Sequence, residues 1–148
     1  TFAGAAAAVR ASVAKLGVDP AGLAMVDASG LSHSDRMYPA ALVQLLNLVV
    51  AGHHPELASM LAALPVAGFT GTLEDRYLTS PAAAAAGVVR AKTGTLDGTA
   101  ALAGYLDDDS GRLLTFALVA GNVPDGATAR TEAALDKVAT GLAACGCG

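Results

Sequence analysis

The sequence has few cysteines, few positive charges and no long uninterrupted apolar run, and each shortage excludes a class of protein. Its two cysteines, Cys145 and Cys147, are too few and too terminal for a disulfide framework or a zinc site. Nine Lys and Arg residues are scattered along a chain of net charge −4, which leaves no basic patch for nucleic acid or an anionic membrane. Gly, Pro, Asp or Arg interrupts every apolar stretch well before the roughly 20 residues that span a bilayer. We therefore expect no nucleic-acid partner and no transmembrane segment.

Apolar residues are plentiful by contrast. The 148 residues are 53% hydrophobic and 15% charged, which is enough to bury the core of one compact, ordered domain. The sequence does not begin with Met and shows no basic-then-apolar leader, so we expect Thr1 to be a processed or truncated start.

Hydrophobic periodicity and turn residues predict an α+β chain. Helical spacing predicts helices over residues 3–16, 39–51 and 55–64, and a last helix, capped by Asp125 or Thr128, that packs Leu135, Val138, Ala139 and Leu142 on a sheet. Short apolar runs predict strands at residues 23–26, from Val88 onward, at 99–106 and at 112–120. The last three form consecutive antiparallel strands, with a solvated turn at residues 107–111. The alanine run at residues 82–86 is either a short helix or a flexible approach to the strand.

The strand that starts at Val88 runs into a Lys-Thr-Gly triplet, which puts a cation, a hydroxyl and a bare backbone in one row. An extended peptide can pair with a strand edge through main-chain hydrogen bonds, Gly94 lets its backbone come close, and Lys92 and Thr93 can bind a carboxylate. These properties suit a short peptide with a free carboxylate at its end. A lysine at a strand end is, however, more often a solvated edge charge, so the triplet needs companions elsewhere in the chain.

Two apparent companions do not qualify. Ser12 and Lys15 form a Ser-x-x-Lys, and residues 34–36 form a near Ser-x-Asn, the two motifs that accompany Lys-Thr-Gly in penicillin-recognising serine enzymes. Ser12 lies in an alanine-rich helix, where a serine beside a lysine is ordinary, and the gaps between the motifs are far too short. Arg36 also has no acceptor, so it cannot replace an asparagine amide. We therefore reject Ser12 as a nucleophile.

A different set of segments occurs in a more specific order. These are residues 27–32 (DASGLS), 64–73 (LPVAGFTGTL) with Arg76, 91–96 (AKTGTL) and 102–105 (LAGY). In this order, and over about residues 3–140, the chain resembles the C-terminal part of a D-alanyl-D-alanine carboxypeptidase of the penicillin-binding protein 4 type (peptidase family S13). The resemblance implies that residues 1–148 are the C-terminal portion of a penicillin-binding-protein and serine β-lactamase-like transpeptidase fold, with an antiparallel sheet packed against helices.

The resemblance also implies a serine acyl-transfer enzyme that removes the terminal D-alanine from peptidoglycan stem peptides. Some members of the family also cut crosslinks between D-alanine and diaminopimelate. The acylating Ser, its partner Lys and the Ser-x-Asn loop precede the matched region in that family and are absent from these 148 residues. The expected partners are therefore the stem peptide, β-lactam antibiotics and the upstream portion of the same enzyme, in an extracytoplasmic location, and no cofactor or metal is implied.

By the family pattern, four consecutive residues form the site. Lys92 supports proton transfer and attracts the terminal carboxylate, Thr93 hydrogen-bonds that carboxylate, and Gly94 keeps the strand open to substrate. The backbone N–H of Thr95 is the expected second donor of the oxyanion hole, the preorganised charge stabilisation that usually dominates acyl transfer.

Leu31 and Leu96 are expected to be apolar walls of the pocket for the substrate side chain, beside the 27–32 loop. His33 departs from the family, where many relatives have Arg to pair with the distal carboxylate of diaminopimelate. An imidazole is only partly charged near neutral pH, so this substrate preference stays open. Thr70 is a second departure, in a place where relatives often have Asp, and we interpret it as loop variation.

Other candidate sites have ordinary interpretations. His53, His54 and Glu56 precede a helix that starts with proline, and adjacent histidines point in different directions, so we expect a solvent-facing turn rather than a metal site. Residues 107–109 lack the ligand spacing of a calcium loop. An alternative function for the whole chain is a noncatalytic module that binds peptidoglycan peptides or a partner protein and uses the Lys-Thr-Gly strand as a docking edge.

Overall fold

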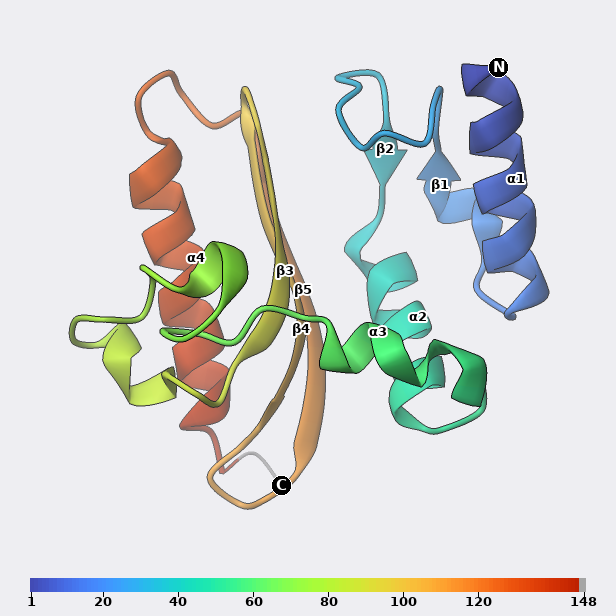
Figure 1. The fold of residues 1–148 in the computed structure, drawn as a ribbon. Helices are drawn as coiled ribbons and strands as arrows, with labels where there is room; N and C mark the ends of the chain where they lie inside the picture. The colour runs from blue at the N-terminus through green and yellow to red at the C-terminus, as the bar shows by residue number, and fades with distance from the viewer. Residues whose placement is uncertain (147–148) are drawn as a thin grey trace. The chain divides into compact units, whose positions relative to one another are not determined.

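The computed structural model describes residues 1–146. Cys147, for which no role was predicted, lies outside these residues. The chain divides into two compact units, Thr1–Ala58 and Ser59–Gly148. Figure 1 shows the elements of both along the chain.

The first unit contains two helices and a small sheet. α1 spans Phe2–Lys15, and the side chain of Thr1 caps it by accepting a hydrogen bond from the N–H of Gly4. After the 3₁₀ turn η1 (Pro20–Gly22), β1 (Leu23–Ala24) pairs antiparallel with β2 (Arg36–Met37), and α2 spans Pro39–Val50. The two predicted helices are confirmed, each within about two residues at its ends.

The prediction was less accurate for the segment between these two helices. The strand predicted over residues 23–26 has only two paired residues, and its partner β2 was not predicted. The reason is that β2 has the sequence Arg36-Met37, with both residues exposed, so it carries no apolar alternation. A side-chain bond shapes the loop between the strands, since the N–H of Val26 donates to Asp35 Oδ1 at 2.8 Å.

The predicted helix over residues 55–64 is divided. Pro55–Leu57 form a 3₁₀ turn, η2, and α3 covers only Ala58–Ala62. Pro55 does stand at the first helical position, as expected.

The second unit is a three-stranded antiparallel sheet with a long helix along one face (Figure 1). β3 (Arg90–Leu96), β4 (Thr99–Asp107) and β5 (Leu113–Gly121) lie in the order β3-β4-β5, and α4 spans Thr128–Ala143. The predicted meander of three strands is confirmed. Before the sheet come two 3₁₀ turns, η3 (Gly71–Leu73) and η4 (Ala82–Ala85), so the alanine run is a short helix rather than a flexible approach.

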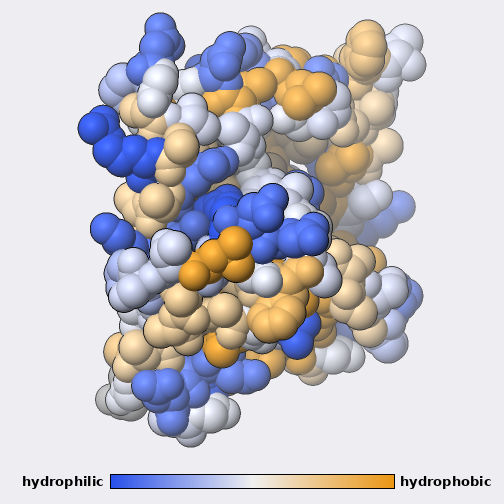
Figure 2. All heavy atoms as spheres, turned by 60° about the vertical axis from the view of Figure 1, so that its left-hand side comes forward, coloured by the Kyte–Doolittle hydropathy of each residue, from blue (hydrophilic) through white to orange (hydrophobic). Residues whose placement is uncertain are grey.

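The core of this unit lies between α4 and the sheet. It contains the buried side chains of Leu73, Val89, Leu102, Leu106, Phe116, Leu135 and Ala139. On the face of the molecule in Figure 2, hydrophilic and hydrophobic residues are interspersed in small groups. No helix in residues 1–146 is both long enough and apolar enough to cross a bilayer.

Two details of α4 correct the prediction. Ala127 precedes the helix as its N-cap and makes no side-chain capping bond, so neither Asp125 nor Thr128 is the cap. Val138, expected on the packed face, is 49% exposed. The buried face is rotated because Asp136 and Thr140 point inward with Ala139, and Asp136 does so as the partner of a buried arginine.

Candidate active site

The Lys-Thr-Gly triplet lies within β3, and its side chains alternate between the two faces of the sheet. Ala91 is fully buried in the core that α4 covers, whereas Lys92 is exposed. Because alternate side chains of a strand share a face, Thr93 and Thr95 lie on the α4 side with Ala91. The triplet therefore presents its cation and its hydroxyl on opposite faces.

Beyond Ala91, the outer edge of β3 pairs with no other strand of residues 1–146. β4 pairs with the inner edge over the whole strand. On the outer edge, the N–H of Ala91 donates to the carbonyl of Pro65 at 2.9 Å. Alternate residues of an antiparallel strand direct their N–H and C=O groups to the same edge, so those of Thr93 and Thr95 lie on the outer edge. This is the arrangement that an extended peptide needs to add itself to a sheet.

The ammonium of Lys92 is held close to this edge. Its Nζ donates to the carbonyl oxygen of Thr93 at 2.6 Å, in an exposed contact. The strand thus places a positive charge beside the backbone groups with which a peptide would pair.

The hydroxyls of Thr93 and Thr95 both make hydrogen bonds on the face of the sheet that α4 covers. Thr93 Oγ1 donates to Thr72 Oγ1, in η3, at 2.9 Å. Thr95 Oγ1 donates to Glu132 Oε1, in the first turns of α4, at 2.7 Å. These contacts fix the strand residues that flank Gly94.

A buried ion pair joins the segment after η3 to the same helix. The guanidinium of Arg76 binds the carboxylate of Asp136 through two contacts, of 2.6 and 3.0 Å, with side-chain exposures of 16% and 7%. Its Nη2 also donates to the carbonyl of Glu132 at 3.2 Å. Arg76 therefore joins the segment that follows η3 to the turn of α4 that carries Glu132.

The fold itself does not require a glycine at position 94. A Cβ built there would meet only the Cβ of Ala101, on β4, at 3.4 Å, which is an ordinary van der Waals distance. A bare backbone at this position instead leaves room for a molecule that approaches the strand.

Leu31, His33 and Leu96 were predicted to line a side-chain pocket. Leu96 is half-buried at the end of β3. Leu31 is 67% exposed and His33 is also exposed, both on the loop between β1 and β2. These two residues belong to the first unit and Leu96 to the second, so the pocket remains a prediction.

Hydrogen bonds within that loop explain its serine-rich sequence. Asp27 Oδ1 accepts from the N–H of Ser29 at 2.8 Å and from its hydroxyl at 2.7 Å. The Ser29 backbone bond first, and then the hydroxyl bond, lower the pKa of Asp27. Nη1 of Arg36 donates to the carbonyl of His33 at 2.7 Å. Ser29 therefore makes turn hydrogen bonds, and Arg36 braces the loop.

The histidines of residues 53–56 do not gather ligands. His54 Nδ1 lies 2.9 Å from Glu56 Oε1, an isolated exposed pair. The pKa of Glu56 is lowered, chiefly by a hydrogen bond from its own backbone N–H and also by His54. Among residues 1–146, no three His, Cys, Asp or Glu side chains are grouped to hold a metal ion.

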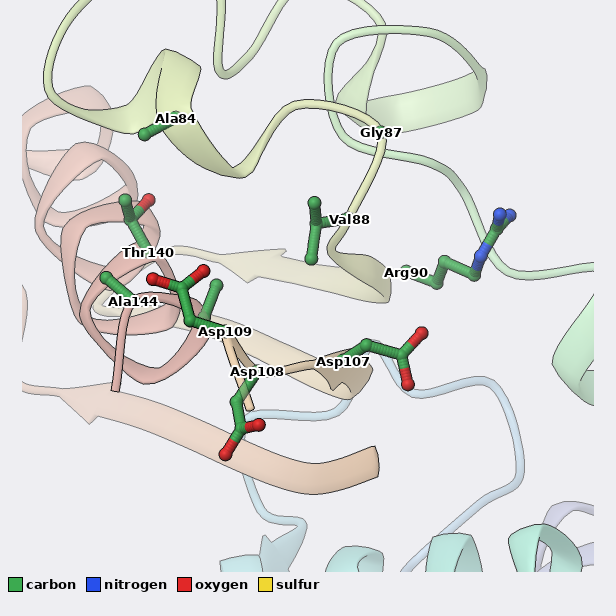
Figure 3. Close-up of a pocket in the computed structure, with 10 residues that line it drawn as sticks. Ala84, Gly87, Val88, Arg90, Asp107, Asp108, Asp109, Thr140 and Ala144 are labelled. Atoms are coloured by element: carbon green, nitrogen blue, oxygen red, sulfur yellow. The ribbon is translucent and has the colours of Figure 1, made fainter. Parts of the chain in front are cut away.

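The hairpin tip between β4 and β5 borders a hollow of about 430 Å³ that includes no residue of the triplet (Figure 3). The carboxylates of Asp107, Asp108 and Asp109 point in different directions there. Asp108 is buried and accepts from Ser110 and Arg112, and these bonds, that of the Ser110 hydroxyl first, lower its pKa to about 2. The acidic run is therefore a hairpin turn, as predicted, but Asp108 is buried and hydrogen-bonded in it rather than solvated.

Sequence reasoning missed the supporting residues of the site. The sequence indicates Thr72 and Arg76 only as parts of a motif, and it predicts no role for Glu132 or Asp136. The predicted packed face of the last helix included Val138 and gave no sign that Asp136 faces inward. The arginine that pairs with Asp136 is 60 residues away in sequence, so the ion pair could not be predicted from the helix alone.

Comparison with known proteins gives one consistent result. A family model described as the D-Ala-D-Ala carboxypeptidase 3 (S13) family matches residues 1–142. The chain is 46% identical to carboxypeptidase DacB of Mycolicibacterium smegmatis, over 100% of this chain and 32% of that protein. It is 41% identical to a D-alanyl-D-alanine carboxypeptidase of Actinomadura, over 75% of this chain and 20% of that protein. The chain thus spans about a third or less of the length of these relatives.

The fold agrees with these matches. The crystal structure of penicillin binding protein 4 from Haemophilus influenzae superposes with a TM-score of 0.73 at 26% identity, over 90% of this chain and 31% of that chain. The α+β class and the predicted fold are confirmed.

Proposed function

Because the chain belongs to the D-Ala-D-Ala carboxypeptidase 3 (S13) family, we propose that it supplies the substrate-binding strand of a serine D-Ala-D-Ala carboxypeptidase. The supporting observation is the outer edge of β3, where the N–H and C=O groups of Thr93 and Thr95 lie beside the ammonium of Lys92. In this proposal a peptidoglycan stem peptide binds along this edge. Its terminal carboxylate lies at the edge itself, where the ammonium of Lys92, folded back to the Thr93 carbonyl, approaches it from one face of the sheet and the hydroxyl of Thr93 from the other.

The reaction is an acyl transfer. A serine hydroxyl from the upstream part of the protein attacks the carbonyl carbon of the penultimate D-alanine, and a base there takes its proton. The amide C–N bond breaks, the terminal D-alanine leaves with a proton on its nitrogen, and water hydrolyses the ester. The N–H of Thr95 donates to the oxyanion of each tetrahedral intermediate, with a second donor upstream.

Lys92 contributes positive charge in two ways. In the free strand its Nζ is bonded to the Thr93 carbonyl, so no new charge has to be brought to the edge when an anionic peptide arrives. The same ammonium stabilises the anionic form of a neighbouring group during proton transfer.

The enzyme acts outside the cytoplasm, where its substrate lies, and β-lactams acylate the same serine. The Haemophilus relative has been solved in complex with a β-lactam, which agrees with this proposal.

The test is Lys92→Ala in the full-length protein that contains this chain, with labelling by a fluorescent penicillin. We expect the acylation rate to fall by about 100-fold or more, the usual effect of removing one group that stabilises the transition state. Lys137→Ala, which removes an exposed lysine of α4, is the matched control and should leave the rate unchanged.

The alternative, a noncatalytic binding module, predicts a different labelling result. Such a module would take up no covalent label in its parent form, and Lys92→Ala would weaken only its reversible binding of a peptide that ends in D-Ala-D-Ala. Absence of a covalent adduct on the parent protein would therefore overturn the proposed enzyme.

A further inference from the structure

The hydroxyl of Thr93 is not alone on its side of β3. Its Oγ1 donates to Thr72 Oγ1 at 2.9 Å, and both side chains are at least partly exposed. A hydroxyl has one proton to donate and can accept two hydrogen bonds. Only one of the two protons can occupy the bond between these hydroxyls, so the other is available for a ligand.

This arrangement has a consequence for an anionic ligand. For Thr93 to donate to a carboxylate, its proton has to point at the ligand and not at Thr72 Oγ1. Thr72 then donates its own O–H to Thr93 Oγ1, so the hydrogen bond between the two residues is kept. A hydroxyl that accepts a hydrogen bond is also a stronger donor, because successive bonds polarise one another.

The position of Thr72 is tightly fixed. Leu73, the next residue of η3, is fully buried, and its carbonyl accepts from the N–H of Gly68 at 2.9 Å. Gly71 has a φ of +57°, and a Cβ there would come within 3.1 Å of Pro65. Pro65 in turn accepts from the N–H of Ala91, on β3, at 2.9 Å. The turn that carries Thr72 is thus fastened to the strand that carries Thr93.

We propose that Thr72 is a positioning residue for the substrate carboxylate, which acts by donating its hydroxyl proton to Thr93 and so aiming the Thr93 proton at the ligand. This rests on the proposed function, which supplies the carboxylate, and adds a residue outside the triplet. Preorganised donors of this kind reduce the ordering cost of binding.

The experiment compares Thr72→Val with the parent full-length protein in acylation by a penicillin with a free carboxylate and by its methyl ester. We expect the second-order acylation rate with the free acid to fall about three- to tenfold, the effect of one neutral hydrogen bond. The rate with the ester, which has no anionic carboxylate to receive the Thr93 proton, should stay within about twofold of the parent.

Two further variants keep the result interpretable. Thr72→Ser retains the hydroxyl and should restore the rate with the free acid, whereas Thr79→Val alters an exposed threonine of the same segment and should change neither rate. Equal losses with acid and ester, or failure of Thr72→Ser to rescue, would overturn the role of Thr72 while leaving the enzyme intact. If the parent protein is not acylated at all, the proposed function fails, and this inference fails with it.

Discussion

At the residue scale, two glycines of the sheet have opposite roles. Gly94 belongs to the triplet, yet a side chain there would meet nothing closer than 3.4 Å within the protein. Gly104, on β4, faces Ala91 across the ladder, and a Cβ there would lie 2.0 Å from the carbonyl oxygen of Arg90 and 2.6 Å from the Cα of Ala91. Gly94 is therefore free to serve a ligand, whereas Gly104 lets β3 and β4 approach each other.

Gly104→Ala should consequently destabilise the fold. The clash is with backbone atoms, which cannot move aside as a flexible side chain would, so we expect a loss of about 1–3 kcal/mol or more in the free energy of unfolding. Urea denaturation followed by circular dichroism measures it. Gly121→Ala, at the end of β5, is the control, because a Cβ there meets nothing within 4 Å. Equal denaturation midpoints for the two variants would contradict this account.

At the scale of elements, α4 connects the segments that frame the site. Its Glu132 accepts from the hydroxyl of Thr95 on β3, and its Asp136 binds Arg76, four residues after Thr72. The helix thereby fixes both the strand and the turn beside it. A helix that packed only by apolar contacts would leave the segment around Arg76 without this polar anchor.

Removing one partner of a buried ion pair leaves the other charge uncompensated. Asp136→Ala should therefore lower the free energy of unfolding by about 3–5 kcal/mol, because it leaves the buried guanidinium of Arg76 without its partner. Chemical denaturation of the full-length protein tests this. The control is Asp125→Ala, an exposed carboxylate that does not cap α4, which should stay within about 0.5 kcal/mol of the parent. A small effect of Asp136→Ala would show that Arg76 finds another partner or reaches water.

The same elements show what sequence could predict. α1, α2 and the three strands of the second unit follow local periodicity, and their predictions are confirmed. Which face of α4 is buried could not be predicted from the residues of the helix alone, because it depends on Arg76, far away in sequence. In the same way, the triplet on β3 was recognisable as a motif, whereas Thr72 and Glu132 take their roles from contacts across the fold.

At the scale of the whole molecule, the chain is about a third of the length of its relatives, so the position of the nucleophile is the decisive question. Ser12 and Lys15 are the two residues that imitate the missing motif. Both are exposed on α1, one helical turn apart. An activated serine needs a base within hydrogen-bonding reach and a surrounding site that excludes water, and an exposed helix surface does not supply the latter.

Ser12→Ala in the full-length protein should therefore leave the rate of penicillin acylation unchanged. Peptide mapping of the acylated parent by mass spectrometry should place the adduct on a serine outside residues 1–148, and the isolated 148-residue chain should take up no label. Substituting the serine identified by mapping is the positive control, and it should abolish labelling. An adduct on Ser12, or label on the isolated chain, would mean that this chain carries its own nucleophile.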